Sequence, residues 1–392
     1  MQPRSPTPLH MGDGKATTSL RSGRLLFLGP RHVPDSYRLL IEAWPEKSPG
    51  RVLVVRDPAG TLALAASRLW PEATVVAHAM DAYELQIARA NAQANEVTGV
   101  EWVLSPDLPE GPFDLVSFPC PSRGEALLSR EFLEQAQRAL VLDGRLLVST
   151  DGNPSWLRKS VKEIFGTEDL QVNDKRRGSV VVSRRKKEVP RLPDHSHVLQ
   201  VPFGDSTLDV RTRPGVFCYG RLDRGTAALL QCLDVEPEHR VLDLGCGAGI
   251  LGLAAARLTA PANVVLIDSN VRATTLAEEN AVRNGLVGAT VALRADLEDV
   301  PGGPFDRVLA NPPYFSKGRI ADAFTRAAAR HLARGGVYQM VAKAVSVHQE
   351  ILEGWFHSVV VDEVFGYGIF TCRNPKVIEP SDGVEPPEGI EL

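Results

Sequence analysis

Residues 240–249 read Arg-Val-Leu-Asp-Leu-Gly-Cys-Gly-Ala-Gly, and the residues that follow, up to about 258, are rich in Ala and Leu. A short apolar run that ends in a glycine-rich turn and opens into an Ala/Leu segment is typical of a buried strand, a tight loop and a helix. Glycines let the backbone turn sharply and let a ligand approach it, because no Cβ stands in the way. This stretch therefore predicts a ligand-binding strand–loop–helix unit of an α/β fold.

The same pattern occurs about 190 residues earlier in the chain. Arg51-Val52-Leu53-Val54-Val55 corresponds to the strand at 240–244, and each is followed by a turn that ends in Ala-Gly and by a helical segment. Phe113-Asp114-Leu115-Val116 corresponds in the same way to Phe305-Asp306-Arg307-Val308. A repeat of this length indicates a duplicated domain and not a solenoid.

Each copy alternates short Val/Leu/Ile runs with Ala-rich segments of helical length. In the second copy the runs are 240–244, 263–267, 290–293, 306–310 and 336–341. Fully apolar strands separated by helices predict a parallel sheet covered on both faces. We predict two tandem doubly wound, Rossmann-like α/β domains.

The domain limits follow from composition. We expect a loose segment at 1–24, a first domain at 25–188, a linker at 189–200, a second domain at 201–378 and a disordered, acid-rich tail at 379–392.

The overall composition is that of an ordinary globular protein, with 392 residues, 43% of them hydrophobic and 23% charged, and a formal net charge of −4. No apolar run approaches the ~18 residues of a membrane-spanning helix, so we expect no membrane association. The five cysteines form no Cys-x-x-Cys pair and the nine histidines form no metal constellation. We expect a cytoplasmic monomer without a metal, in which any nucleic-acid binding depends on a local basic patch.

The glycine-rich turn predicts a nucleoside cofactor. Its candidate binding residues are Asp243, Gly245, Cys246, Gly247 and Gly249. Asp268 ends the next strand, where a carboxylate can accept both hydroxyls of a ribose, and Ser269 follows it. Asp296, after the fourth strand, is a candidate acceptor for an adenine amino group.

Two cofactors compete for this loop. Residues 247–252 match the G-x-G-x-x-G pattern of dinucleotide-binding proteins, which is a weak signal alone. Asp243 argues against a dinucleotide, because a carboxylate there repels a pyrophosphate. The same carboxylate suits the cationic sulfonium and amino groups of S-adenosylmethionine, which is therefore the predicted cofactor.

A second motif, Asn311-Pro312-Pro313-Tyr314, follows the strand at 306–310 and so lies at the carboxyl end of the predicted sheet. The Asn311 side-chain oxygen and the Pro312 carbonyl can each accept an N–H from a planar exocyclic amine and aim its lone pair at a methyl group. Pro312 and Pro313 stiffen the loop, and Tyr314 offers a face on which a base can stack. These four residues are the predicted catalytic residues.

These two motifs together resemble a class I S-adenosylmethionine-dependent methyltransferase that acts on amines. The segment Pro214-Gly215-Val216-Phe217-Cys218-Tyr219-Gly220-Arg221-Leu222-Asp223-Arg224-Gly225-Thr226 further resembles the RsmC/RlmG family of ribosomal RNA guanine-N2 methyltransferases. The resemblance implies two tandem methyltransferase-like domains with only the second active. It also implies a cofactor and substrate pocket bordered by Phe217, Gly220 and Asp223, in which these three residues and Asn311 contact the cofactor. It implies methylation of guanine N2 in small-subunit 16S ribosomal RNA, with the RNA or the small subunit as partner. Tyr314-Phe315 stands where the family has Phe-His, which leaves the target nucleotide open.

The first copy has lost these motifs. Val54 stands in place of Asp243, Arg56 and Pro58 replace two glycines, Ala79 replaces Asp268, and Phe118-Pro119-Cys120-Pro121 replaces Ala310–Pro313. We expect the first domain to bind no cofactor. Two basic runs near its end, 175–177 and 184–187, are either the solvated end of a hairpin strand or a phosphate-contacting patch.

Three alternatives remain open on the residues alone. Asn-Pro-Pro-Tyr also serves adenine N6 in RNA or DNA and a glutamine side-chain amide of a protein, because both present a planar NH₂ group. An NAD-dependent oxidoreductase would use residues 247–252. A non-catalytic RNA-binding scaffold fits the first copy but not the intact motifs of the second.

Overall fold

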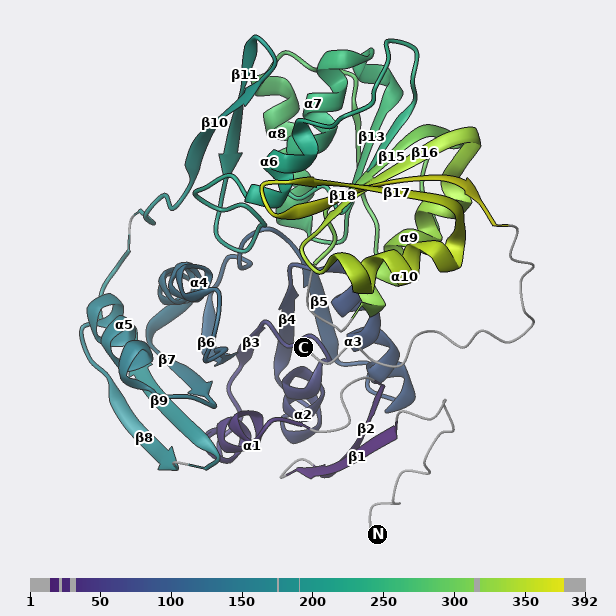
Figure 1. The fold of residues 1–392 in the computed structure, drawn as a ribbon. Helices are drawn as coiled ribbons and strands as arrows, with labels where there is room; N and C mark the ends of the chain where they lie inside the picture. The colour runs from purple at the N-terminus through teal and green to yellow at the C-terminus, as the bar shows by residue number, and fades with distance from the viewer. Residues whose placement is uncertain are drawn as a thin grey trace. The chain divides into compact units, whose positions relative to one another are not determined.

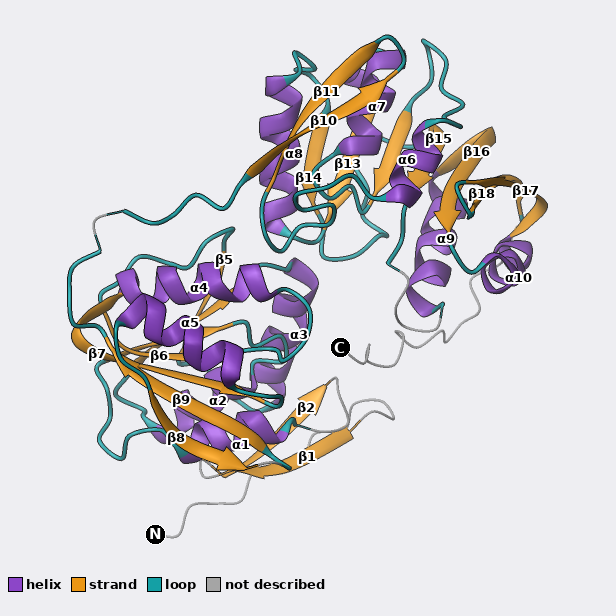
Figure 2. Ribbon diagram, turned by 60° about the vertical axis from the view of Figure 1, so that its left-hand side comes forward, coloured by secondary structure: helices purple, strands orange, loops and turns teal. Residues whose placement is uncertain are grey.

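The structure, a computed structural model, describes residues 15–20, 23–28, 33–174, 176–189, 191–313 and 318–376. The chain forms two compact units that divide between Asp194 and His195 (Figure 1). Each unit holds a seven-stranded sheet with helices packed against it (Figure 2). The predicted fold class, two tandem Rossmann-like α/β domains, is confirmed.

The sheet of the first unit has the strand order β5-β4-β3-β6-β7-β9-β8. The first five strands are parallel to one another, β9 pairs antiparallel with β7, and β8 pairs antiparallel with β9. Its strands are β3 (Arg51–Val55), β4 (Thr74–Ala79), β5 (Val100–Leu104), β6 (Phe113–Pro119), β7 (Leu140–Thr150), β8 (Asp169–Asp174) and β9 (Gly178–Arg184). Its helices are α1 (Asp35–Glu42), α2 (Thr61–Leu69), α3 (Ala82–Ala94), α4 (Ala126–Ala139) and α5 (Ser155–Phe165).

The sheet of the second unit has the matching order β14-β13-β12-β15-β16-β18-β17. Its strands are β12 (Val241–Leu244), β13 (Val264–Asp268), β14 (Thr290–Leu293), β15 (Phe305–Ala310), β16 (Leu332–Ala342), β17 (Phe356–Val364) and β18 (Tyr367–Pro375), and a separate hairpin is formed by β10 (His197–Phe203) and β11 (Ser206–Thr212). Its helices are α6 (Arg224–Leu230), α7 (Ile250–Leu258), the short η1 (Pro261–Asn263), α8 (Val271–Arg283), α9 (Arg319–His331) and α10 (Val345–Trp355).

The prediction of a parallel sheet is correct for five strands of each unit. It is wrong for the remaining two, β8 and β9 in the first unit and β17 and β18 in the second, which form antiparallel pairs. In the second unit β17 and β18 are joined by Phe365 and Gly366, whose φ angles are 54° and 77°. Two consecutive positive φ angles are typical of a tight two-residue hairpin, and such a short connection can join only antiparallel strands.

The parallel strands are apolar because both of their faces are covered. On β12, Val241 belongs to the core that packs under α7 and α8, whereas Leu242 and Leu244 belong to the core of the opposite face with α9 and α10. Strand side chains alternate between faces, so Asp243 lies on the same face as Val241. This alternation places a carboxylate beneath the start of α7.

The ends of the units differ in part from the expected limits. Within the segment expected to be loose, strand β1 (Lys15–Leu20) pairs with β2 (Gly23–Leu28) as an antiparallel hairpin. In the expected linker, 189–200, strand β10 already begins at His197. The expected acidic tail at 379–392 lies outside the described residues.

The amino ends of the two sheets are built alike. The backbone N–H of Arg240 donates to Oδ2 of Asp306 (2.9 Å), and that of Arg51 donates to Oδ2 of Asp114 (2.8 Å). In each unit the guanidinium of that arginine also lies over the ring of the phenylalanine that precedes the aspartate. The duplication seen in the sequence thus extends to the same side-chain contacts.

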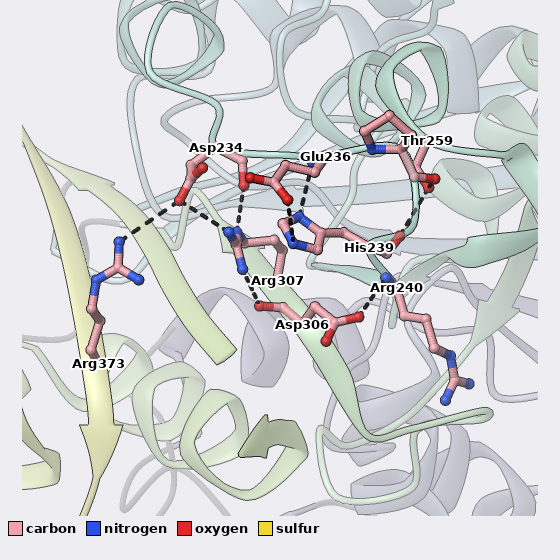
Figure 3. A network of polar contacts seen from close by, with 9 residues as sticks. Asp234, Glu236, His239, Arg240, Thr259, Asp306, Arg307 and Arg373 are labelled. Atoms are coloured by element: carbon pink, nitrogen blue, oxygen red, sulfur yellow. Dashed lines mark hydrogen bonds and ion pairs between the residues drawn. The ribbon is translucent and has the colours of Figure 1, made fainter. Parts of the chain in front are cut away.

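A polar network completes this end of the second sheet (Figure 3). Arg307 on β15 pairs with the Asp234 carboxylate (3.1 Å), which also lies 3.8 Å from the guanidinium of Arg373 on β18. The Thr259 hydroxyl donates to the carbonyl of His239 (3.0 Å). These contacts fasten the segment between α6 and β12 to the sheet, so the amino end is structural and the carboxyl end is left for a site.

Candidate functional site

Three chain segments with the predicted motifs start side by side at the carboxyl end of the second sheet. Leu244, the last residue of β12, pairs with Ile267 of β13 on one side and with Ala310 of β15 on the other. Neighbouring strands lie about 4.8 Å apart. The glycine loop after Leu244, Asp268 after Ile267 and Asn311 after Ala310 therefore begin at one edge, as the sequence predicts.

The glycine loop needs residues that tolerate a left-handed backbone. Gly247 and Gly249 have φ angles of 56° and 89°, which side chains with a Cβ rarely adopt. A Cβ on Gly249 would also lie 3.2 Å from that of Ala277 in α8. The side chain of Asn280 donates to the carbonyl of Ala248 (2.9 Å) and holds the loop from the other side.

Gly252, the third glycine of the dinucleotide-like pattern, has a packing role. It lies in α7, and a Cβ there would come within 2.5 Å of Leu266 on β13 and 3.1 Å of the Asp243 carboxylate. The glycine lets the helix approach the sheet closely. The match to G-x-G-x-x-G is therefore explained without a pyrophosphate.

Asp243 is a buried carboxylate with one oxygen unused. The side chain is 1% exposed, and its Oδ2 accepts the backbone N–H of Gly252 (2.8 Å). Its Oδ1 is buried and has no hydrogen-bond partner among the described residues. Burial raises the pKa of Asp243 to about 7, with the nearby Asp268 carboxylate adding to the effect. A donor or cationic ligand group at Oδ1 would satisfy an atom that is otherwise costly to bury.

Asp268 links the glycine loop to the next helix. Its Oδ2 accepts the backbone N–H of Gly247 (2.8 Å), and its Oδ1 accepts that of Asn270 (2.9 Å), the N-cap of α8. A carboxylate has about four lone-pair directions, so it retains acceptor capacity for ligand hydroxyls. Ser269 lies between these two residues in the same turn.

Asp296 is less closely tied to the loop. It is exposed, and its Oδ1 accepts the backbone N–H groups of Glu298 (3.0 Å) and Asp299 (3.2 Å). The carboxylate closes its own turn after β14.

The segment Pro214–Thr226 lies against the glycine loop. Arg272, which is fully buried, donates to the carbonyl of Pro214 (2.6 Å), and the side chain of Asn270 donates to that of Gly215 (2.9 Å). Phe217 is 54% exposed, and its Cβ lies 3.9 Å from where a Cβ on Gly247 would be.

Gly220, with a φ angle of 69°, turns the same segment back and donates its N–H to the Thr212 hydroxyl (3.2 Å). No sequence pattern marks Arg272 as buried, because an arginine in an amphipathic helix is normally exposed.

Asn311 is held by two residues of the same segment. Its Nδ2 donates to Oδ2 of Asp223 (3.2 Å) and to the hydroxyl of Thr226 (2.9 Å). The family resemblance predicts Asp223 at this site but assigns no role to Thr226. Pro312 is buried and Pro313 exposed, and Tyr314 lies outside the described residues.

Burial disfavours the thiolate form of the two cysteines near the loop. Burial raises the pKa of Cys246 well above its ordinary value and that of Cys218 to about 11. Among the described residues, no group of three or more His, Cys, Asp and Glu side chains could hold a metal ion. No described helix has the length and apolarity needed to cross a membrane.

Comparison with known proteins agrees with this geometry. The fold and the paired motifs define a protein of the class I methyltransferase type. The chain matches the methyltransferase small domain family at residues 30–180 and again at 207–371, once in each unit, which is more than half of its length.

Curated relatives narrow this class. A ribosomal RNA small subunit methyltransferase C of Ectopseudomonas mendocina is 30% identical over 256 residues, covering 62% of this chain and 76% of the relative. One of the same name from Pseudomonas entomophila is 35% identical over 171 residues, covering 43% of this chain and 51% of the relative. The chain belongs to the ribosomal RNA small subunit methyltransferase C family, although it spans only about half the length of several of these relatives.

A solved structure shares the fold along nearly the whole chain. It is that of the T. thermophilus 16S rRNA N2 methyltransferase RsmC in complex with AdoMet and guanosine, with a TM-score of 0.73 and 22% identity. The match covers 92% of this chain and 98% of the other. The family resemblance read from the motifs is confirmed.

Proposed function

We propose that the second unit transfers a methyl group from S-adenosylmethionine to the exocyclic N2 amine of a guanine in 16S ribosomal RNA, in the cytoplasm. The observation that carries the proposal is the Asn311 amide, which is held at the end of β15 beside the glycine loop after β12. The names of the curated relatives and of the RsmC structure support the substrate and the cofactor.

The residues of the second unit fit this cofactor. The unpartnered Asp243 Oδ1 suits its cationic amino end, and Asp268, fixed by two backbone N–H groups, suits the ribose hydroxyls. Gly245, Cys246, Gly247 and Gly249 would form the floor, with Ser269 and Asp296 on the adenosine side. When bound, the cofactor supplies a methyl group on a sulfonium, which a weak nucleophile can attack.

The chain's part in the reaction is positional. Asn311 Oδ1 and the Pro312 carbonyl would each accept one N–H of the guanine amine, which turns its lone pair toward the methyl group. Pro312 and Pro313 keep these acceptors in place at low entropic cost. The bound cofactor would supply the methyl group and keep the electrons of the carbon–sulfur bond, while the two acceptors would hold the amine, which would pass one proton to water. Phe217 and Tyr314 are the aromatic side chains proposed to stack on the base.

The first unit is proposed to bind no cofactor. Its loop after β3 carries Asp57, whose carboxylate accepts the first three N–H groups of α2 from Thr61, Leu62 and Ala63. Arg56 of that loop pairs with Glu125 of the loop after β6 (2.6 Å). Side chains of the protein itself thus occupy the edge where the second unit has its motifs.

The basic runs of the first unit support a structural role more than RNA docking. Arg177 pairs with Glu42 (2.8 Å), and Arg184 donates to the carbonyl of Asp143 (2.8 Å). Arg185 is buried and donates to the carbonyls of Arg138 and Leu140. Cations that are engaged in this way contribute less to phosphate binding.

The test is nucleoside mass spectrometry of 16S rRNA and of small subunits incubated with the protein and S-adenosylmethionine. N2-methylguanosine is expected with the wild-type protein and should be lost with Asn311→Ala, which should keep its affinity for S-adenosylhomocysteine. N6-methyladenosine instead, or full transfer by Asn311→Ala, would contradict the proposal.

A further inference from the structure

The orientation of the Asn311 amide is the feature from which a further role follows. A side-chain amide has a donor end and an acceptor end of nearly equal shape, so packing alone does not choose between its two orientations. Only one of them is useful to the proposed reaction, because the guanine amine can donate to Oδ1 but not to Nδ2. Something in the site must therefore select the orientation.

Asp223 supplies this selection. A carboxylate offers only lone pairs, so the amide group that faces its Oδ2 at 3.2 Å must be the NH₂. A flipped Asn311 would set two acceptor oxygens against each other. The Oδ1 atom is thereby turned to the opposite side of the amide, away from Asp223.

Thr226 adds a second hydrogen bond in the same sense. Its hydroxyl lies 3.5 Å from Oδ2 of Asp223, toward which it can donate, and 2.9 Å from Nδ2 of Asn311, from which it accepts. The three polar groups form a short chain that ends at Asn311. A charge-assisted bond to the NH₂ also polarises the amide, which makes its oxygen a stronger acceptor.

Asp223 and Thr226 are themselves held at the start of helix α6. Asp223 is the N-cap of this helix and accepts the backbone N–H of Thr226 (2.9 Å), and Thr226 is 3% exposed. The selecting groups are therefore rigid before any substrate arrives.

The first copy lacks all three residues of this hydrogen-bonded chain, Asp223, Thr226 and Asn311. Helix α1 of the first copy, which begins at Asp35, corresponds to helix α6, which begins at Arg224. Pro34 therefore stands in place of Asp223, and Tyr37 in place of Thr226. Pro119 stands in place of Asn311. The first copy keeps the helix without Asp223 and Thr226, so these two residues are not needed for the fold. Their loss together with Asn311 is expected if their role is to hold the Asn311 amide.

We infer that Asp223 and Thr226 are positioning residues, which fix the Asn311 amide with its oxygen toward the substrate amine. This inference rests on the proposed function and goes beyond it, because it assigns the rate of transfer to residues that need not touch the substrate.

The test is Asp223→Ser. In the wild type one oxygen, Oδ2 of Asp223, both caps the Thr226 N–H and accepts from Asn311. Serine is as good an N-cap as aspartate, so helix α6 is kept, but its shorter side chain no longer extends to Asn311, and its hydroxyl can donate as well as accept. We expect kcat for N2-methylguanosine formation to fall roughly 10- to 100-fold, less than the roughly 10²–10³-fold typical of losing a direct transition-state hydrogen bond. KM for the RNA and the Kd of S-adenosylhomocysteine should stay within about twofold.

Two further variants keep the test sharp. Asp81→Ser makes the same exchange at the N-cap of α3 in the first unit and should leave kcat unchanged. Thr226→Val, which removes the hydroxyl at nearly constant volume, should lower kcat several-fold, whereas Thr226→Ser should restore it.

The outcomes separate the two proposals. If the wild-type protein forms no N2-methylguanosine, the proposed function is wrong. If it does and Asp223→Ser retains its full kcat, the inference is wrong. A fall in kcat matched by an equal loss of cofactor affinity or of thermal stability would also overturn it, because that pattern indicates a structural cap alone.

Discussion

Replacing Asp243 by Asn is expected to stabilise the protein at pH 8 and to weaken its binding of S-adenosylmethionine at the same time. Burial raises the pKa of this carboxyl from 3.8 to about 7. Between these two pH values the folded protein holds a proton that the unfolded chain releases. One pKa unit corresponds to about 1.4 kcal/mol, and the ionised carboxylate therefore costs the folded protein about 4 kcal/mol.

The sign of the pH dependence follows from proton linkage. Below about pH 4 both states carry the proton and the cost is absent. Between about pH 4 and pH 7 only the folded state carries it, so the free energy of unfolding falls as the pH rises. Above about pH 7 the full cost remains. An asparagine at 243 can still accept the Gly252 N–H and does not titrate, so its advantage should grow over this range.

The assay is urea denaturation of the full chain at half-unit steps from pH 5 to pH 8, with calorimetric titration of S-adenosylhomocysteine at each pH. Asp306→Asn is the matched control, because this carboxylate caps the opposite end of the same sheet through the Arg240 N–H. A stability difference between Asp243→Asn and wild type that does not change with pH would refute the reasoning. So would an unchanged Kd, since an NH₂ group at the former Oδ1 should repel a cationic ligand.

Two other predictions concern packing and charge. Gly252→Ala should lower the free energy of unfolding by about 1–3 kcal/mol and weaken cofactor binding, because the new Cβ would lie 2.5 Å from Leu266. Gly354→Ala in α10 is the control: nothing lies within 4 Å of its new Cβ, so it should stabilise the protein by up to about 1 kcal/mol. Equal effects of the two variants in thermal unfolding would contradict this account. Arg185→Gln should destabilise the first unit by about 1–3 kcal/mol, since two backbone carbonyls lose a buried donor. A filter-binding measurement should find RNA affinity and its salt dependence unchanged, and a reduced salt slope would restore the docking interpretation.

The sequence predicted best where local pattern and burial agree. The expected runs 240–244 and 306–310 became β12 and β15 almost residue for residue, because central parallel strands must be apolar on both faces. The antiparallel strands β17 and β18 were not foreseen. β17 is largely exposed, so its sequence lacks the continuous burial that marks the others.

The side-chain contacts of the site were predicted only in part. The sequence predicts Asn311 and Asp243 as site residues because their motifs are local. The bond from Asn311 to Thr226 joins residues 85 apart, and no periodicity of either segment encodes it. Arg272 was missed for a related reason: a charged helical side chain is buried here only because the Pro214 carbonyl and its neighbourhood receive it.

The two copies share some side-chain contacts and differ in others. At the amino ends of the sheets, both copies keep the arginine–aspartate contact and the arginine over a phenylalanine ring. Beneath the glycine turn both keep an asparagine that donates to the alanine carbonyl, Asn91 to Ala59 and Asn280 to Ala248. At the carboxyl ends the first copy replaces the motif residues. Contacts that serve the fold are expected in both copies, whereas under the proposed function those that serve the reaction are needed only in the second. Asp223 and Thr226 are absent from the first copy although both belong to a helix start, and this supports the positioning role inferred for them more strongly than their distances alone.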